Sequence, residues 1–478
     1  MPNEYPAGSF TTGVPAPIGD DILAALDACG LDYDVSTQSR ADHGRDWWPL
    51  SLVSVHQGRV PHWPGVVVRA HATSDVVALL GIANAHRTPV TAQGGRSGVV
   101  GGAVAPTGAI ALDLTGLDRI LDVDVVSGTV SVEAGVFGPD LESSLRARGF
   151  TIGHFPQSFD LSTVGGWLAC RGAGQYSNRY GKIEDIVRGL TIVLASGDVL
   201  ELGGRGARQA VGPDLVQLFV GSEGTLGIIT RATLTIGPIA TYGARRAYGF
   251  PGFAQGLDAC RRVLQRGARP AVLRLYDAIE SQRIFGVDTC ALIVLDEGDP
   301  ALVDAAMNVV EEECSTGDAL DVLHVATWLE HRNDVGALAP LWEHGIVVDT
   351  IEVAGPWRIL ASLCDDVVGA LTRLAPTIAA SVHQSHAYPD GACLYFTFAG
   401  KPDGDPTTYY RAAWDAAIHE VLAHGAAISH HRGVGRNRAR FVADALGSAF
   451  PLLESLKATL DPQAILNPGV LALGGPAW

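Results

Sequence analysis

Three glycine-rich segments, separated by short runs of Val, Ile and Leu, most constrain how this chain can fold. They are 93-QGGRSGVVGG-102, 162-STVGGWLACRGAG-174 and 221-GSEGTLGIIT-230. The apolar runs between them, such as 190-LTIVLASG-197, predict strands. Glycine lets a backbone approach another backbone, or a ligand, with no Cβ in the way. The stretch 89–236 is therefore predicted to be a β-rich platform for a long, phosphate-bearing cofactor.

Length and charge exclude several classes of protein. A chain of 478 residues exceeds the size at which one core usually splits, so more than one domain is expected. The net charge of −17 argues against a nucleic-acid partner. No apolar run approaches the roughly 20 residues of a transmembrane helix, and the N-terminus lacks the features of a secretory signal. Seven scattered cysteines without a CxxC pair favour a reducing compartment, so a cytoplasmic location is predicted.

The pattern of helices and strands divides the chain into four parts. A β-α-β unit is predicted over 64–92, and a Gly- and Pro-marked boundary lies near 237–249. Beyond it, alternating strands and helices are typical of an α+β domain. The polar, aromatic segment 38–48 has no clear period, and both a loop over a ligand and a plain surface loop fit it. The predicted parts are a lead-in over 1–60, a cofactor domain over 61–238, a substrate domain over 239–445 and a helical end over 446–478.

Several familiar motifs are absent from the sequence. There is no GxGxxG, no P-loop, no GxSxG and no HExxH. His383 and His386 form an HxxH on a predicted strand, where a period of two would place them on opposite faces. This spacing disfavours a shared metal.

Residues 64–236 resemble the flavin-binding domain of the vanillyl-alcohol oxidase / p-cresol methylhydroxylase superfamily. The matching motifs are GGxSG at 94–98, PQSxDxSTVGG at 156–166, GxIED at 181–185 and GSEGTLGIIT at 221–230. The resemblance implies an α+β protein, with a two-subdomain FAD-binding domain and a substrate domain built on a central antiparallel sheet. It also implies FAD as the cofactor.

The resemblance assigns the cofactor-binding residues motif by motif. Converging backbone amides suit a pyrophosphate, and the first motif would supply them from Gly94, Gly95, Arg96, Ser97 and Gly98. The second would continue along the diphosphate, ribityl chain or isoalloxazine with Pro156, Ser162, Thr163, Gly165 and Gly166. The third would flank the adenosine or the ring with Glu223, Gly224, Ile228 and Ile229. Arg96 stands where some relatives carry a linking His, so non-covalent FAD is expected, with His154 as the remaining candidate for a covalent link.

The C-terminal half is similar to the alkyldihydroxyacetonephosphate synthase family. The motifs are 269-RPAVLRLYD-277, 391-GACLYFTF-398, 428-ISHHRGVGR-436 and 461-DPQAILNPGVL-471, together with 349-DTIEVAGPW-357. The resemblance implies a site made of Arg274, Tyr395, His430 and His431.

Each side chain suits one role in that site. An arginine fork binds phosphate or carboxylate. A phenol whose pKa is lowered by neighbouring cations can act as a general acid or base. Imidazoles that titrate near neutrality can shuttle protons. Arg274, Tyr395 and the His430–His431 pair are assigned these roles in turn.

One departure from the family pattern keeps two functions open. Arg432 replaces a third histidine, which questions the ether-forming step and favours another anion contact. The metal motifs of the FAD-dependent 2-hydroxyacid dehydrogenases are broken at 386–395 and 431–435, so no metal is predicted. The alternatives are a synthase-like reaction on a small anionic substrate at the flavin N5, and metal-independent oxidation of a 2-hydroxy acid or alcohol. A binding or regulatory protein that has lost catalysis is a third hypothesis, and a homodimer is a further expectation.

Overall fold

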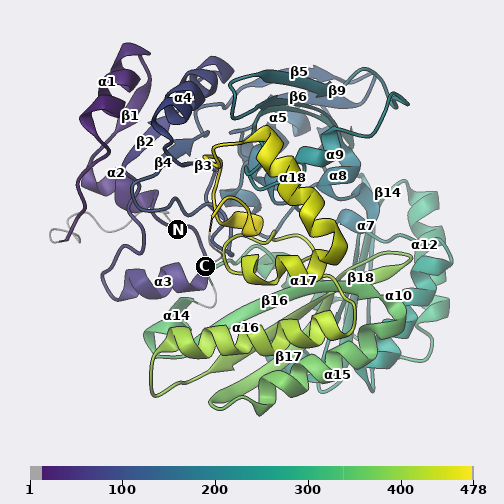
Figure 1. Cartoon of the computed structure of the whole chain (residues 1–478). Helices are drawn as coiled ribbons and strands as arrows, with labels where there is room; N and C mark the ends of the chain where they lie inside the picture. Colours follow the sequence, from purple (N-terminus) through teal and green to yellow (C-terminus); the bar gives the residue numbers. More distant parts are fainter. Residues whose placement is uncertain (1–12, 337–338, 476–478) are drawn as a thin grey trace.

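The computed structural model describes residues 13–336 and 339–475 (Figure 1). Its strands form a four-stranded, a five-stranded and a seven-stranded sheet, with a short two-stranded pair. The larger two sheets are antiparallel throughout. The predicted α+β class with a central antiparallel sheet is confirmed.

The first sheet follows the lead-in and contains the predicted β-α-β unit. Strands β2, β4 and β3 run parallel, and β1 pairs antiparallel with β2. The crossover helix α4 packs Leu79 and Leu80 against the strands, where both side chains are fully buried. In sheet order the strands are β1 (Asp32–Asp34), β2 (Val66–Arg69), β4 (Ile110–Asp113) and β3 (Val90–Gln93), and the helices are α1 (Asp20–Ala28) and α4 (Thr73–His86).

The second sheet carries the second and third glycine-rich segments in its connections. In sheet order its strands are β5 (Ile120–Asp124), β6 (Thr129–Glu133), β10 (Ile228–Thr235), β8 (Val187–Val193) and β9 (Val199–Gly203). Short helices join them: α5 (Gly138–Arg146), α6 (Val164–Ala169), α7 (Ser177–Tyr180), α8 (Ile183–Ile186), α9 (Val216–Phe219) and the 3₁₀ turn η1 (Phe159–Leu161). Strands β7 (Phe150–Thr151) and β11 (Gly237–Pro238) pair beside it.

The seven-stranded sheet separates an outer helical layer from the glycine-rich loops (Figure 1). In sheet order its strands are β15 (Asp318–Ala319), β12 (Tyr242–Phe250), β14 (Cys290–Gly298), β13 (Val272–Tyr276), β17 (Thr377–Ala387), β18 (Gly391–Gly400) and β16 (Val347–Pro356). The outer layer consists of α10 (Phe253–Gln265), α12 (Pro300–Glu313), α15 (Trp357–Arg373) and α16 (Pro406–Ala423). Near the inner face lie α11 (Ala278–Phe285), α13 (Leu323–His331) and α14 (Ala339–Glu343).

Side chains alternate between the two faces of each strand, and this decides which of them face the glycine-rich loops. In β13, Leu273 and Leu275 pack into the outer core, whereas Val272 and Tyr276 pack into the core below the glycine-rich loops. Successive residues of a strand point to opposite faces, so Arg274 shares the inner face with Val272 and Tyr276. The seven-stranded sheet therefore presents its polar side chains to the glycine-rich platform.

The segment 38–48 differs from its prediction as a loop. Ser36 caps α2 (Thr37–Asp42) by accepting a hydrogen bond from the Ser39 N–H, and α3 (Pro49–His56) follows. Most of 40–48 is buried, and Trp47 lines the central cavity. The short helix was missed because its six residues are too few to show a helical period.

The C-terminal segment returns to the first sheet and the third glycine-rich segment. Its elements are η2 (Ala439–Phe441), α17 (Val442–Leu446), η3 (Gly447–Ala449), α18 (Phe450–Leu460) and η4 (Val470–Ala472). The buried Lys457 ammonium donates to the carbonyls of Thr225 and Leu466, and Leu466 bridges to Val90. Among the described residues, no helix is both long and apolar enough to cross a membrane.

Candidate active site

A single cavity of about 780 Å³ lies between the glycine-rich loops and the inner face of the seven-stranded sheet. Arg274, Tyr395, His431 and Arg432 line it, whereas His430 is not among the described residues that do. The cofactor-binding residues predicted from the sequence line the same cavity: Gly94, Gly95, Arg96, Ser97, Gly98, Pro156, Ser162, Thr163, Gly165, Gly166, Glu223, Gly224, Ile228 and Ile229. The structure thus brings the two predicted sets of residues together.

Close packing of two loops explains the glycines of the first motif. A Cβ at Gly94 would overlap with the Thr163 hydroxyl, and one at Gly95 would overlap with the Leu161 carbonyl oxygen. Between them and Ser97, Arg96 adopts a positive φ of 51°. Non-glycine residues are uncommon in this region of φ and gather at functional sites.

The first motif has the donors that a pyrophosphate needs. Within the described chain, the backbone N–H groups of Arg96, Ser97 and Gly98 have no hydrogen-bond acceptor, and neither does the buried Nε of Arg96. Donors left without acceptors at a cavity wall fit a bound anion. These residues would hold the diphosphate of FAD.

The one histidine considered for a covalent flavin link, His154, is fully buried, and its ring packs 4.9 Å from that of Trp167. Arg96, which stands where some relatives carry a linking His, does line the cavity. His154 is not among the described residues that line the cavity. Non-covalent FAD, released when the protein is precipitated by acid, therefore remains the prediction.

Burial sets the protonation states of the reactive side chains. It raises the pKa of Tyr395 to about 12, although Arg432 and Arg274 act in the opposite direction. It lowers the pKa of His430 to about 4 and that of His431 well below its usual value. The expectation of an acidic phenol was therefore wrong, because the cost of burying its charge exceeds the effect of the neighbouring cations. The expectation of imidazoles that titrate near neutrality was also wrong, because burial disfavours their protonated forms and, at His431, the neighbouring arginines act in the same direction.

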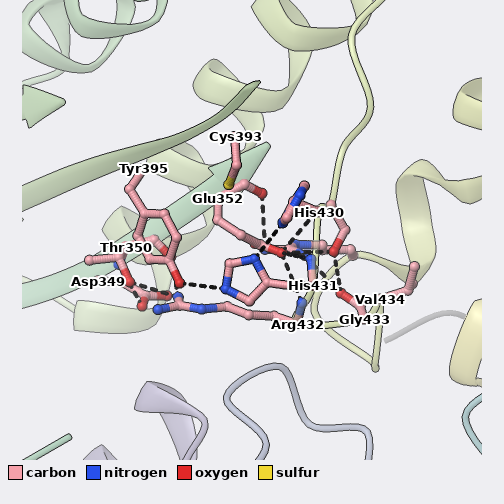
Figure 2. Close-up of polar contacts among 12 residues, drawn as sticks. Asp349, Thr350, Glu352, Cys393, Tyr395, His430, His431, Arg432, Gly433 and Val434 are labelled. Atoms are coloured by element: carbon pink, nitrogen blue, oxygen red, sulfur yellow. Dashed lines mark hydrogen bonds and ion pairs between the residues drawn. The ribbon is translucent and has the colours of Figure 1, made fainter. Parts of the chain in front are cut away.

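Tyr395, His431 and His430 form a directed chain of hydrogen bonds (Figure 2). The Tyr395 hydroxyl lies 2.8 Å from Nε2 of His431, and the Nδ1 atoms of His431 and His430 are 2.7 Å apart. Because the phenol is protonated, it donates to His431 Nε2. The neutral His431 then carries its proton on Nδ1 and donates to His430. The chain leads from the cavity to a residue outside its lining.

A buried carboxylate holds the histidine loop in place. Glu352 accepts hydrogen bonds from the backbone N–H groups of His430, His431 and Arg432 at 3.0–3.2 Å (Figure 2). It also forms an ion pair with Arg438. Burial alone would raise the pKa of Glu352, yet Arg438 and the other donors lower it to about 2. The loop is therefore held by a fully buried carboxylate that is ionised at neutral pH.

The arginine that departs from the family pattern lies directly against the phenol. The guanidinium carbon of Arg432 is 4.7 Å from the ring centroid of Tyr395. Its Nη1 donates to the Thr350 hydroxyl at 2.7 Å and to the Thr350 carbonyl at 2.9 Å. A fixed cation thus stands at the cavity wall beside Tyr395.

Glu223 joins the flavin platform to the same loop. Its carboxylate accepts hydrogen bonds from the backbone N–H groups of Val434 at 2.6 Å and Gly435 at 2.8 Å. The residue was predicted to flank the cofactor. Glu223 does line the cavity, and its carboxylate oxygens accept hydrogen bonds from the segment that follows Arg432.

A β-bulge overturns the prediction for the HxxH motif. The register of β17 against β18 shifts between Gln384 and His386. The extra residue turns His386 to the same face as His383, so both line the cavity. The prediction of opposite faces was wrong because a period of two holds only in a regular strand.

His383 belongs to a buried pair that sequence reasoning missed. Its Nδ1–H donates to Glu280 at 2.8 Å, and its Nε2 accepts from Arg274 at 3.1 Å. Burial would raise the pKa of Glu280, but His383 and Thr397 lower it to about 2. The HxxH was the only hint in the sequence, since α11 and β17 are about a hundred residues apart.

Three imidazoles and a thiol gather behind Tyr395. The ligand atoms of His386, Cys393, His430 and His431 lie within 4.8 Å of one another. Nitrogen and sulfur donors suit zinc and similar metals. The cluster could hold such an ion, but both nitrogens of His431 are engaged by Tyr395 and His430. The absence of a metal stays a prediction that elemental analysis can test.

Comparison with known proteins identifies the family. Residues 64–203 match the FAD binding domain family, and residues 243–471 match the C-terminal domain of FAD linked oxidases. An uncharacterised FAD-linked oxidoreductase of Escherichia coli, YgcU, is 30% identical over 85% of this chain and 89% of its own. The chain belongs to the FAD-linked oxidase family. It is an FAD-dependent enzyme whose substrate these matches do not determine.

Three further matches describe its place among the relatives. An alkyldihydroxyacetonephosphate synthase of Caenorhabditis elegans is 29% identical over 95% of this chain and 83% of its own. A solved structure of an alkyldihydroxyacetonephosphate synthase superposes with a TM-score of 0.80 at 26% identity, over 95% of this chain and 87% of that one. The fold is also that of p-cresol methylhydroxylase, with a TM-score of 0.77 at 16% identity over 96% and 98% of the two chains.

Proposed function

We propose that this FAD-linked oxidase acts on a small anionic substrate by a synthase-like reaction. In this reaction a carbon next to a carbonyl group loses a proton and reacts at the flavin. One observation carries the proposal: the Tyr395–His431 hydrogen bond lies at the cavity whose glycine-rich side would hold FAD, with Arg274 and Arg432 in the same wall. When bound, the FAD supplies an electrophilic isoalloxazine ring that can accept a carbanion or a hydride.

The arginines would bind and orient the anion. The guanidinium groups of Arg274 and Arg432 have no carboxylate partner among the described residues, and both line the cavity. A planar fork binds a phosphate or carboxylate through two hydrogen bonds and fixes its orientation. The substrate carbon would thereby be held next to the Tyr395 hydroxyl.

The hydrogen-bond chain would take the substrate proton. As the Tyr395 oxygen accepts a proton from carbon, its own proton passes to Nε2 of His431, and the Nδ1 proton of His431 passes to His430. Each imidazole starts neutral, because burial lowers its pKa, so each can accept a proton. In a synthase-like reaction the carboxylate leaves, an alkoxide oxygen forms the new ether bond, and the flavin ends in its starting oxidation state.

The His383–Glu280 pair favours a second candidate function, the oxidation of a 2-hydroxy acid or alcohol. Glu280 keeps the His383 proton on Nδ1, which leaves the Nε2 lone pair facing Arg274 in the cavity wall. If Arg274 turned to a substrate carboxylate, Nε2 would be free to take the hydroxyl proton while a hydride left the carbinol carbon. This reaction leaves the flavin reduced.

The two candidates are separated by the redox state of the flavin. The purified holoenzyme is incubated without oxygen, first with an acyl-dihydroxyacetone phosphate and a long-chain alcohol, then with glycolate and D-lactate. Ether product with an oxidised flavin spectrum would support the synthase-like reaction. Bleaching by a hydroxy acid would support oxidation. Neither product nor bleaching with any of these substrates would contradict both.

A cytoplasmic location and a homodimer are also proposed. All seven cysteines are free, which supports a reducing compartment. Light scattering of the purified protein tests the dimer, and fractionation of the native host tests the location.

A further inference from the structure

Arg332 is an arginine of the cavity wall that neither candidate reaction uses. It follows helix α13 and lines the cavity. Its guanidinium carbon lies 4.9 Å from the ring centroid of Tyr176, 5.7 Å from that of Phe155 and 5.8 Å from that of Trp328. Three aromatic rings that attract a cation therefore fix the position of this group.

The charge of Arg332 is not neutralised by the part of the chain that the structure describes. Its Nη1 is buried without a hydrogen-bond acceptor there, and no ion pair joins it to a carboxylate. Asp334 lines the same cavity, but it is exposed and does not pair with Arg332. A buried donor without an acceptor costs free energy, which is recovered when a ligand supplies the acceptor.

The other carboxylates of this wall are already engaged. Glu280 accepts from His383, and Asp349 accepts from the Tyr410 hydroxyl at 2.7 Å and the Trp414 N–H at 3.1 Å. Among the described residues these carboxylates are not available to Arg332, which leaves its Nη1 open to an acceptor from a ligand in the cavity.

Arg332 and Arg274 lie near the same indole ring. The guanidinium carbon of Arg274 is 5.3 Å from the Trp328 ring, and that of Arg332 is 5.8 Å from it. Both groups line one cavity, so a single small molecule can reach both. A neutral oxygen could accept from Nη1 of Arg332, but only an anionic group would also neutralise its charge.

We infer that the substrate carries two anionic groups, one bound by Arg274 beside Tyr395 and the other by Arg332. The inference rests on the proposed function, since it extends the same cavity from one anion to two. Carboxylate and phosphate share the oxygen geometry that an arginine fork recognises. The substrate class is thus a short dicarboxylate or a short phosphorylated carboxylate.

Binding to the holoenzyme tests this inference without turnover. Butyrate, succinate and 2-phosphoglycolate are titrated while the visible absorbance of the bound flavin is recorded. The dianions are expected to bind about 10- to 100-fold more tightly than butyrate, because they add a charge-assisted hydrogen bond. Whichever dianion binds more tightly identifies the second group as carboxylate or phosphate.

Variants decide whether Arg332 causes the preference. R332Q is expected to remove the advantage of the dianions while the Kd of butyrate stays within about twofold, and R332K is expected to keep part of the advantage through its charge. R283Q is the matched control, because Arg283 lines the same cavity but already faces Glu280. It should keep the preference. Flavin content and thermal unfolding are measured for each variant, so that a folding defect is recognised.

The inference is overturned by equal affinities for butyrate and both dianions in the wild type, or by R332Q weakening all three ligands equally. The absence of any flavin response to the three ligands would overturn it as well. The proposed function and the second anion can fail independently. If R274Q weakens butyrate binding but the wild type shows no preference for dianions, the single-anion site stands and only the second anion is lost.

Discussion

The flavin platform and the substrate wall of the same cavity are built by different means. The platform, 93–102 with 156–166 and 221–229, presents backbone amides from loops that pack without side chains between them, as at Gly94 and Gly95. The wall presents side chains from β13, β17, β18 and the 430–436 loop. Backbone amides can hold a cofactor that many relatives share. The reaction depends instead on which side chains contact the substrate.

The two regions also treat charge differently. The platform leaves backbone donors open for an anion. In the wall, buried carboxylates anchor other groups: Glu352 holds three successive N–H groups of the histidine loop, and Glu280 holds His383. Changes in the platform should therefore abolish flavin binding, whereas changes in the wall should alter catalysis while the flavin stays bound.

The largest effect is expected for G95A in the platform. The added Cβ would overlap with the Leu161 carbonyl oxygen, so the two loops would have to separate. We expect a colourless protein that does not take up FAD, measured as the ratio of visible to ultraviolet absorbance after reconstitution. The matched control is G81A in helix α4, where a Cβ meets open space and should stabilise the fold by about 0.5–1 kcal/mol. A yellow G95A protein would contradict the role of loop packing.

A large catalytic effect with intact flavin is expected for Y395F in the wall. Loss of the hydroxyl breaks the chain to His431, so kcat should fall about 10²- to 10⁴-fold. The flavin spectrum and the flavin content should be unchanged. The matched control is Y409F, whose hydroxyl bonds to Thr377 and whose ring packs in the outer core. Unchanged turnover in Y395F would refute the proton-transfer role.

E352Q should lower the free energy of unfolding by about 3–5 kcal/mol, measured by urea denaturation, because it leaves the Arg438 charge buried without its partner. The control E313Q removes a partner of Arg262 near the surface and should cost much less than E352Q, because solvent screens that pair. Similar losses in the two variants would argue against a special role for the buried pair.

The same carboxylate predicts a pH window. The pKa of Glu352 is lowered to about 2 in the folded protein, from an ordinary value near 4.5. Its contribution to stability is therefore present above pH 4.5 and is lost as the pH falls towards 2. The stability difference between wild type and E352Q should shrink over this window, and a difference that does not change with pH would contradict the assignment.

The smallest effect is expected from metal removal. Both nitrogens of His431 already have partners, and burial holds the pKa of the Cys393 thiol well above its usual value. Two of the four members of the cluster are therefore poorly suited to bind a metal ion. Dialysis against EDTA should leave kcat within about twofold. Loss of activity that is restored by zinc or manganese would instead show that the cluster is a metal site.

Most of the platform could be predicted from the sequence. The glycine motifs, the β-α-β unit over 64–92 and the FAD cofactor all depend on local patterns, because glycine at a tight backbone contact is needed whatever lies further away. Arg274 and Tyr395 were also found through short motifs. The helix over 37–42 escaped prediction because so short an element has no period.

The protonation states and the partners in the wall could be decided only by the tertiary structure. A single bulge in β17 brings His383 and His386 to one face of the sheet, and no periodic pattern in the sequence predicts this bulge. Burial raises the pKa of Tyr395 and lowers those of His430 and His431, and burial depends on elements that are distant in sequence. The sequence by itself determined that the chain holds FAD, because backbone contacts impose local residue types. Which side chains meet the substrate, and with which charges, was decided by packing between residues a hundred or more positions apart.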